Sequence, residues 1–299
     1  MDHRQLAFLA ALARERHFGR AAAACHVTQP TLSARLRGLE EELGVRLIRR
    51  GRRYEGLTPE GERVLGHARR ILGEFEALRG ELAPDAPLTG RLTLGVIPTA
   101  LGTLAEPLAG LRASHPRLRV RLRELATPRL AQGLENGELD LVLGYLDAPA
   151  MAGFAHRPLH EERPALLASP RHFRLPGAPD WTSLGDYPLC LLTPEMHNRQ
   201  LLAARLEGLE RTASGRQESG LSRPLEPCLE ANSIAALLAM VGAGLGVGVL
   251  PVECLPATAS GILARRLPGP GDRVGLLWRP QRPRSRLLEE VLAAWPASP

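Results

Sequence analysis

The sequence predicts an α/β protein, with a small helical module at its N-terminus and a larger domain of alternating strands and helices behind it. Apolar residues in the first 80 positions recur at helical spacing, with cap and proline signals at the expected ends. From residue 91 onward, short apolar runs alternate with helical patterns, which is typical of a mostly parallel sheet. Two prolines and a glycine within residues 83–90 predict a linker between the two parts. A length of 299 residues accommodates both.

The N-terminal module is predicted to contain three helices. Residues 3–15 and 18–25 form the first two, and the third begins after Thr28, a good N-cap, with Pro30 in its first turn. Gly44 is expected to end the third helix. One face of that helix carries its leucines, namely Leu32, Leu36, Leu39 and Leu43. This spacing predicts a helix-turn-helix packed on its leucine face.

The opposite face of the third helix has the chemistry of a DNA-reading surface. Its first exposed turns are small or hydrogen-bonding, so the end of the helix can approach base edges closely. Gln29 can bond adenine through two hydrogen bonds, and the carbon atoms of Pro30 or Thr31 can touch a thymine methyl group. The helix N-terminus itself favours phosphate. A generic three-helix bundle is the alternative.

Positive charge is concentrated around this helix. Residues 1–57 carry 11 arginines against 6 acidic residues, a net charge of +5 out of +6 for the whole chain. All 38 basic residues are arginine, whose planar, permanently charged guanidinium suits phosphate. Five of them lie within residues 46–53, on a predicted turn that resembles a wing reaching the DNA backbone or minor groove. A solvated run of charges is the alternative.

A longer helix is predicted to start at Thr58-Pro59 and to run to about Leu82. Its apolar residues step by four and three positions, which is the spacing of a heptad seam. The seam could pack on its own domain, but the three preceding helices already fill a small core, so we predict a helix–helix dimer contact. The predicted dimerisation residues are Val64, Ala68, Ile71, Phe75 and Leu78.

The remaining chain is predicted to alternate strands and helices. The predicted strands are 91–97, 119–125, 139–145, 163–168, 187–192, 225–230, 246–250 and 273–278. The predicted helices are 100–113, 128–136, 196–211, 232–243 and 284–295. In such sheets, ligands bind beyond the C-terminal ends of the strands, near helix N-termini.

Several classes of function are disfavoured. No apolar run approaches the length of a transmembrane helix. The four cysteines form no CxxC or metal-ligand spacing and no clear pair for a thiol switch, so we expect free thiols in the reducing cytoplasm. The glycine-rich residues 242–248 follow a helix instead of a strand, which is the wrong order for dinucleotide binding. His115 and His197 are isolated, which favours surface or cap roles.

Two alternative functions, an enzyme and an exported binding protein, lack supporting features in the sequence. No catalytic grouping and no metal cluster has a supporting context, so an enzyme on this scaffold is disfavoured, and we predict neither catalytic residues, a metal nor a cofactor. An exported binding protein would need an export signal, and the chain shows none.

The residues now described resemble those of the LysR-type transcriptional regulators. The resemblance runs through "HFGRAAAACHVTQPTLSARLRGLEEELGVRLIRRGRRYEGLTPEGERVL" and is most specific in "VTQPTLSARLRGLEEELGVRL". It continues in "GRLTLGVIPTALGTLAEPLAGLRASHPRLRVRL", "LENGELDLVLGYL" and "MVGAGLGVGVLP", and so covers almost the whole chain. Residues 150–225 are its least diagnostic part.

The resemblance implies a winged helix-turn-helix, a linker helix that dimerises, and a bilobed effector domain like a type II periplasmic binding protein. It implies a cytoplasmic homodimer or homotetramer bound to double-stranded operator DNA, a small-molecule effector, RNA polymerase as a candidate partner, and no membrane. The implied DNA-binding residues are Thr28, Gln29, Pro30, Thr31, Ser33, Arg35, Arg37, Arg50, Arg52 and Arg53. Two positions depart from the family pattern: Ile48 replaces a common aromatic residue, and Ala34 replaces a polar or basic one.

The effector site is expected between the two lobes, at strand ends and helix starts. The helix N-terminus after Pro98 and the Thr99 hydroxyl could hold an anion, and a helix cap or turn is the alternative role for each residue. The predicted effector-binding residues are Thr99, Ala100, Thr127, Tyr145, Asn232 and Ser233. No strongly acidic residue dominates this set, so we expect a small organic anion.

These expectations divide the chain into four parts. The predicted parts are a DNA-binding domain 1–58, a dimerisation helix 59–82, a hinge 83–90 and an effector domain 91–299. Within the last, subdomain I is predicted to span about 91–161 and 267–299, and subdomain II about 162–266.

Overall fold

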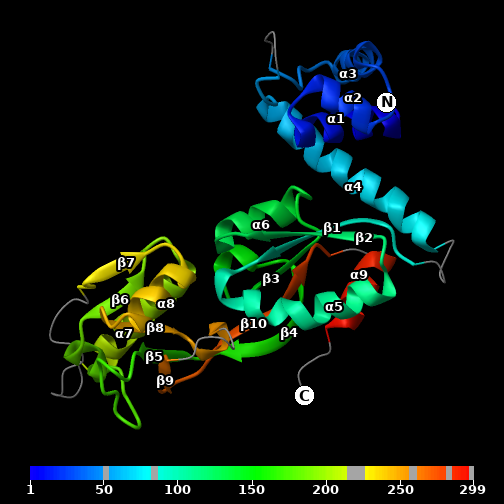
Figure 1. Cartoon of the computed structure of the whole chain (residues 1–299). Helices are drawn as coiled ribbons and strands as arrows, with labels where there is room; N and C mark the ends of the chain where they lie inside the picture. Colours follow the sequence, from blue (N-terminus) through cyan, green and yellow to red (C-terminus); the bar gives the residue numbers. More distant parts are fainter. Residues whose placement is uncertain (50–53, 82–86, 214–225, 256–260, 281–284, 296–299) are drawn as a thin grey trace.

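A computed structural model of the chain describes residues 1–49, 54–81, 87–213, 226–255, 261–280 and 285–295. In Figure 1 a helical module lies at the top, one long helix descends obliquely from it, and two α/β lobes lie below, side by side. No helix in the described ranges is both long and apolar enough to cross a membrane.

The module contains the three predicted helices, α1 (His3–Glu15), α2 (Phe18–Ala24) and α3 (Gln29–Leu43). Local signals fix their ends. Asp2 and Gln5 form a reciprocal capping box at the start of α1, and Thr28 accepts a hydrogen bond from the backbone of Thr31 at the start of α3. Gly44, at φ +68°, takes the left-handed conformation that ends α3. The predicted start and end of this helix are confirmed.

The helix α4 (Pro59–Glu81) connects the module to the lobes. Its first half packs on the module, where Ala68 and Leu65 are buried in the core with leucines of α1 and α3. Further along, Arg69 of α4 contacts the first lobe, 3.4 Å from the Asn136 carbonyl oxygen and 3.5 Å from Glu138. The helix is therefore fixed to a neighbour at both of these places.

The first lobe is a five-stranded sheet in the order β2-β1-β3-β10-β4. Its strands are β1 (Gly90–Val96), β2 (Leu118–Glu124), β3 (Leu141–Tyr145), β4 (Ala155–Glu162) and β10 (Asp272–Trp278). Its helices are η1 (Pro98–Leu104), α5 (Ala105–Ser114), α6 (Thr127–Glu135), η2 (Pro149–Met151) and α9 (Arg286–Ala294). Both faces of the sheet are covered, which explains why every residue of β3 is buried.

The second lobe is a sheet in the order β7-β6-β8-β5-β9. Its strands are β5 (Pro164–Ala168), β6 (Leu189–Leu192), β7 (Leu229–Ala231), β8 (Val247–Pro251) and β9 (Leu263–Arg266). Its helices are η3 (Thr182–Asp186), α7 (His197–Ala213), α8 (Ile234–Gly242) and η4 (Val252–Cys254). The chain passes between the lobes twice, after Glu162 and before Asp272.

The prediction of mostly parallel sheets is wrong. Among the described strands, four pairs are parallel and four are antiparallel. Every antiparallel pair includes β5 or β10, the strands that follow the two crossings between the lobes. The sequence analysis also did not predict the strands β4 and β9. The strand β4 is buried only at Leu159 and Glu162, and most of its other positions carry polar, charged or proline residues, so neither apolar continuity nor alternation marks it.

Candidate functional site

The predicted DNA-reading surface forms one continuous, exposed end of α3. Thr28, Gln29, Pro30 and Thr31 are all exposed, and the hydroxyls of Thr28 and Thr31 lie 2.8 Å apart. Their burial pattern is the reverse of the leucine face, where Leu32, Leu36 and Leu39 are buried. The first turn of α3 is thus free to enter a groove, while its other face holds the helix on the module.

The residues farther along α3 that are predicted to contact DNA differ in their exposure to solvent. Arg35 is exposed and lies 3.9 Å from Asp2, which is a weak surface pair. Arg37 is exposed and donates from Nε to the Ser33 carbonyl oxygen at 3.4 Å, and Ser33 is half-buried. Ala34, where a polar side chain is usual in the resembling family, is exposed and offers no hydrogen bond.

The predicted wing is framed by a small antiparallel bridge. Ile48 pairs with Leu57, and Arg49 donates from its backbone to Gly56 at 3.1 Å and from Nε to Leu57 at 3.0 Å. Ile48, which stands where an aromatic residue is common in the resembling family, packs against the module core. The predicted wing contacts Arg50, Arg52 and Arg53 lie outside the described residues.

The predicted dimerisation seam divides into two parts. Ala68 is fully buried, and Val64 packs against the same core, so these two positions belong to the interior of the module. The assignment of Ala68 to a dimer contact is therefore wrong, because α1 already covers it. Ile71, Phe75 and Leu78 are exposed by 37%, 44% and 52%, and Phe75 contacts His3 with ring centroids 5.2 Å apart.

A buried polar cluster lies where the two lobes meet. Thr99 and Tyr145, both predicted effector residues, are 97% and 96% buried, and their hydroxyls are 3.1 Å apart. The Tyr145 hydroxyl donates to Oε2 of Glu162 at 2.7 Å. Glu162 is fully buried and is the last residue of β4, directly before the chain crosses to the second lobe. We call Thr99, Tyr145 and Glu162 the junction cluster.

Burial controls the charge of the junction cluster. Removal from water raises the pKa of Glu162 to about 7, and hydrogen bonds from Tyr145 and Thr99 only partly oppose this shift. Its second oxygen, Oε1, has no hydrogen-bond partner among the described residues. His160, whose Nε2 lies 4.0 Å from that oxygen, is held neutral because burial lowers its pKa. The cluster is thus an acid poised near neutral pH with one unfilled hydrogen-bonding position.

The second lobe closes over this cluster. His197, at the start of α7, lies with its ring centroid 5.0 Å from that of Tyr145, and burial lowers its pKa. Burial, assisted by the nearby carboxylates of Glu162 and Glu253, raises the pKa of the Cys254 thiol in η4 to about 12. His197 is half-buried at the first position of α7, so it lies at a helix start but also packs against Tyr145. His115 is the C-cap residue of α5, as the predicted cap role has it, but it is buried, and its Nδ1 accepts from the Leu88 backbone at 3.2 Å.

The other predicted effector residues are dispersed. Thr127, which starts α6, is 98% buried, and its hydroxyl has no hydrogen-bond partner in the described part of the chain. Ala100 is fully buried beside Thr99 in η1. Asn232 is exposed and Ser233 is half-buried, at the start of α8 in the second lobe. Ser233 occupies the N-cap position of α8, but its side chain makes no capping hydrogen bond.

Sequence reasoning missed Glu162 and His197. Neither has a motif around it, and Glu162 ends a strand that the apolar pattern does not mark. The only available signal was position, since Glu162-Arg163-Pro164 precedes an apolar strand. Glu162 changes the electrostatics expected of the effector site, because the predicted effector-binding residues carry no negative charge of their own.

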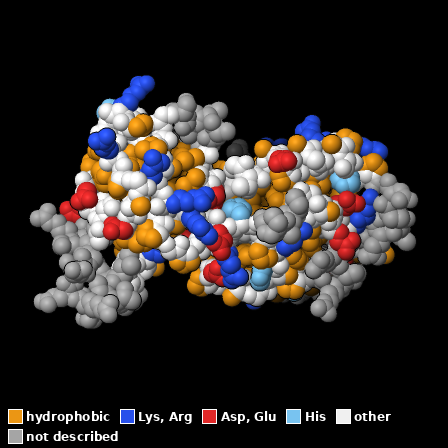
Figure 2. Space-filling view, turned by 90° about the horizontal axis from the view of Figure 1, so that it is seen from below, with side chains coloured by type: hydrophobic (Ala, Val, Ile, Leu, Met, Phe, Trp, Pro, Cys, Tyr) orange, Lys and Arg blue, Asp and Glu red, His pale blue; other side chains and the backbone are white. Residues whose placement is uncertain are grey.

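Elsewhere at the junction, charges are paired. In the view from below, arginines and acidic side chains intermix where the lobes meet (Figure 2). Arg205 lies 2.9 Å from Asp272 and Arg266 lies 3.1 Å from Glu253. These pairs leave the Glu162 carboxyl as the group at the junction that is both buried and free to change its charge near neutral pH.

Two family patterns match the chain and together cover most of it. The bacterial regulatory helix-turn-helix proteins of the lysR family match residues 3–62, and the LysR substrate binding domain matches residues 85–295. The chain belongs to the LysR family of transcriptional regulators. It is therefore a DNA-binding regulator with an N-terminal helix-turn-helix and a C-terminal LysR substrate-binding domain, and its family is one of transcription factors, not of enzymes.

Similar proteins within the LysR family carry related names. The "DNA-binding transcriptional dual regulator OxyR" of Escherichia coli K12 is 34% identical over 98% of this chain and 94% of its own length. A "probable hydrogen peroxide-inducible genes activator" of Streptomyces viridosporus is 36% identical over 97% of this chain and 92% of its own length. The structure of a full-length OxyR variant from Pseudomonas aeruginosa, with a cysteine replaced by aspartate, has a TM-score of 0.78 at 28% identity and covers 98% of this chain and 94% of that one.

Proposed function

We propose that this LysR-family chain binds operator DNA in a sequence-specific manner, and that a small molecule bound between its two lobes controls the binding. The proposed DNA-binding domain is residues 1–58, in which the exposed first turn of α3 and the adjoining predicted wing would contact DNA. The proposed dimerisation helix is 59–82, with 83–90 as hinge and 91–299 as effector domain. The functional unit would be a homodimer or homotetramer, with RNA polymerase as a further candidate partner.

The junction cluster is the observation that carries the effector part of the proposal. Buried polar atoms without partners are costly, and here Glu162 Oε1 is buried without a partner among the described residues. Thr99 and Tyr145 supply further hydroxyl groups beside the acid. A small molecule with hydrogen-bonding groups would satisfy an atom that the protein leaves unsatisfied, and it would touch both lobes.

An organic anion fits this cluster only when Glu162 is protonated. Since its pKa is about 7, a protonated Glu162 can donate to a carboxylate below that pH, whereas an ionised Glu162 repels it. A thermal-shift screen of small carboxylates at pH 6 and pH 8 tests this. We expect the stabilising carboxylate to bind more weakly at pH 8, by up to about tenfold per pH unit above 7. An effector that binds more tightly at pH 8 would identify a donor or cation instead.

The DNA part of the proposal is tested by changing Gln29, an exposed residue in the first turn of α3 that would contact a base edge. Operator fragments can be selected from random DNA with the full-length protein, and affinities then compared by fluorescence anisotropy. Gln29→Ala should cost about 1–3 kcal/mol on the selected sequence and little on random DNA. Glu41→Ala, an exposed change at the far end of the same helix, serves as control. Equal losses on all sequences would show that Gln29 holds the backbone and reads no base.

A second candidate function is a response to hydroperoxide, because similar proteins are named hydrogen peroxide-inducible genes activators. One observation favours it. The sulfurs of Cys190 and Cys228 lie 2.8 and 3.3 Å from the position that a Cβ would occupy on Gly246, so they border the same small volume. Burial raises the pKa of Cys190 to about 11, which disfavours its thiolate. Cys228 is exposed and would be the attacking sulfur.

The proposed oxidation consumes one hydroperoxide for each pair of thiols. The Cys228 thiolate displaces hydroxide from the O–O bond and becomes a sulfenic acid; the Cys190 thiol then displaces water to form a disulfide. Mass spectrometry of the peroxide-treated, non-reduced protein should show this pair linked. Cys228→Ser should abolish the link, whereas Cys254→Ser, which removes another sulfur near the junction, should preserve it. Intact thiols after treatment would leave the ligand-controlled function as the remaining one.

A further inference from the structure

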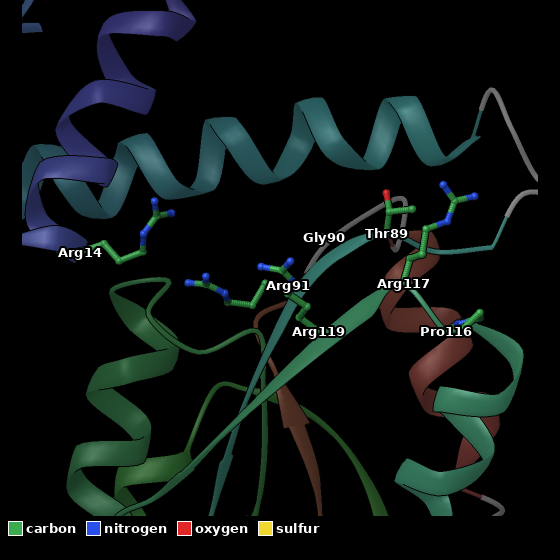
Figure 3. A pocket seen from close by; sticks show the side chains of 7 residues that line it. All are labelled: Arg14, Thr89, Gly90, Arg91, Pro116, Arg117 and Arg119. Atoms are coloured by element: carbon green, nitrogen blue, oxygen red, sulfur yellow. The ribbon is translucent and has the colours of Figure 1, made fainter. Parts of the chain in front are cut away.

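A pocket of about 810 Å³ lies between the DNA-binding module and the first lobe, and arginines dominate its lining. Arg14 comes from the last turn of α1, Arg91 from β1, and Arg117 and Arg119 from the start of β2 and the turn before it. Figure 3 shows the side chains of Arg91 and Arg119 extending toward Arg14 across the space beneath α4. No acidic residue lines this pocket among the described residues.

The arrangement places like charges against each other. Arg91 and Arg119 are directly opposite in the parallel register of β1 and β2, so they share one face of the sheet. Like charges in this relation destabilise a sheet. Within the described ranges neither has an acid within ion-pair distance, nor does Arg117. Glu15 already accepts a hydrogen bond from Arg14 at 2.7 Å, which is the main cause of its lowered pKa, and Arg91 adds to that depression.

Charged side chains on an edge strand usually prevent it from pairing with other chains, but this role does not explain the arginines that line the pocket. The strand β2 lies at the edge of its sheet, where charged side chains discourage pairing with other chains. Arg123 at the other end of β2 follows that rule and is neutralised by Glu138 at 3.1 Å. Protection of the edge gives no reason for Arg14, on another domain, and Arg91, on an inner strand, to converge on the same space.

The two walls of the pocket belong to different functional parts of the protein. The helix α1 is part of the DNA-binding module, whereas β1 and β2 belong to the sensor domain. Arg69 of α4 holds the helix on the first lobe through Asn136 and Glu138, which sets the distance between these walls. A ligand in this pocket would therefore link the part that reads DNA to the part that senses.

We propose that this pocket binds a small phosphate-bearing molecule, with Arg14, Arg91 and Arg119 as its ligands. Guanidinium groups form paired, charge-assisted hydrogen bonds with phosphate oxygens, and a multivalent anion removes the repulsion within the group. Free phosphoanions and DNA backbone phosphates share this chemistry. The helix α3 lies on the side of the module away from the first lobe (Figure 1), which favours the free molecule.

The test titrates inorganic pyrophosphate into the full-length protein at constant ionic strength and records the melting temperature. The wild-type protein should show a saturable rise, and the double variant R91Q/R119Q should bind at least about tenfold more weakly. The control R112Q/R121Q removes the same charge from two exposed arginines outside the pocket lining and should behave as wild type. Without pyrophosphate, R91Q/R119Q should melt at a higher temperature than wild type, because the opposed charges are gone.

Two outcomes would overturn the proposal. An equal loss in both double variants, or a response that does not saturate, would indicate general screening of positive charge. A second experiment measures how the affinity of the wild-type protein and of R91Q/R119Q for duplex DNA depends on salt concentration. If R91Q/R119Q reduces the salt slope by one to two units, roughly 0.9 per phosphate contact, and pyrophosphate competes with DNA, the pocket holds the DNA backbone and the small-molecule site is refuted.

Discussion

The proposed DNA-reading end of α3 and the junction cluster are opposite kinds of site. The first is exposed and is contributed by consecutive residues of one helix, with its buried leucines behind it. The second is buried and joins residues 46 and 17 positions apart in the sequence, with His197 reaching it from the other lobe. The exposed site can change its chemistry with little effect on folding, whereas any change of charge in the buried site also changes stability.

The largest expected effect comes from removing the support behind the exposed site. Leu36 of α3 is 2% exposed, and Leu36→Ala should lower the free energy of unfolding of the module by about 2–5 kcal/mol. Urea denaturation of the full-length protein should then show the module unfolding before the lobes, with loss of DNA binding. Leu43→Ala, at a position 37% exposed on the same helix, should cost far less. A single unchanged transition would mean that the lobes hold the module together.

A comparable but pH-dependent effect is expected at Glu162. The native pKa is raised from 4.5 to about 7, so between these values the folded protein binds more protons than the unfolded chain. The free energy of unfolding should therefore fall as pH rises from 4.5 to 7, by about 3 kcal/mol, and stay level above 7. Glu162→Gln should lack this decline. Urea denaturation at pH 5, 6, 7 and 8 measures it.

The control for this prediction lies next to it in the chain. Glu161 is exposed and forms a surface pair with Arg163 at 3.3 Å, so Glu161→Gln should retain the wild-type decline. If Glu162→Gln keeps the decline as well, another buried group titrates in this range, and the junction cluster is less strongly coupled to stability than its burial suggests.

The same contrast explains what the sequence could predict. Caps, proline and leucine spacing act within a few residues, so the limits of α3 and its exposed face followed from local rules. Thr99 and Tyr145 were also found, because strand ends mark such positions in α/β folds. Glu162, His197 and the pairing of Arg91 with Arg119 depend on which strands become neighbours, and no local pattern specifies that topology.

The smallest expected effect on folding, and the sharpest test of where the module ends, lies in α4. Phe75 is 44% exposed and packs its ring against that of His3 on the module, so Phe75→Asp should change the free energy of unfolding of a protomer by about 0.5 kcal/mol or less. If Ile71, Phe75 and Leu78 form the proposed dimer seam, the same change should nevertheless yield monomers in sedimentation velocity, because it buries a charge in that seam. His67→Asp, an exposed change on the same helix outside the seam spacing, should leave assembly intact. Unaltered assembly of Phe75→Asp would place Phe75 with Ala68, as packing within one chain.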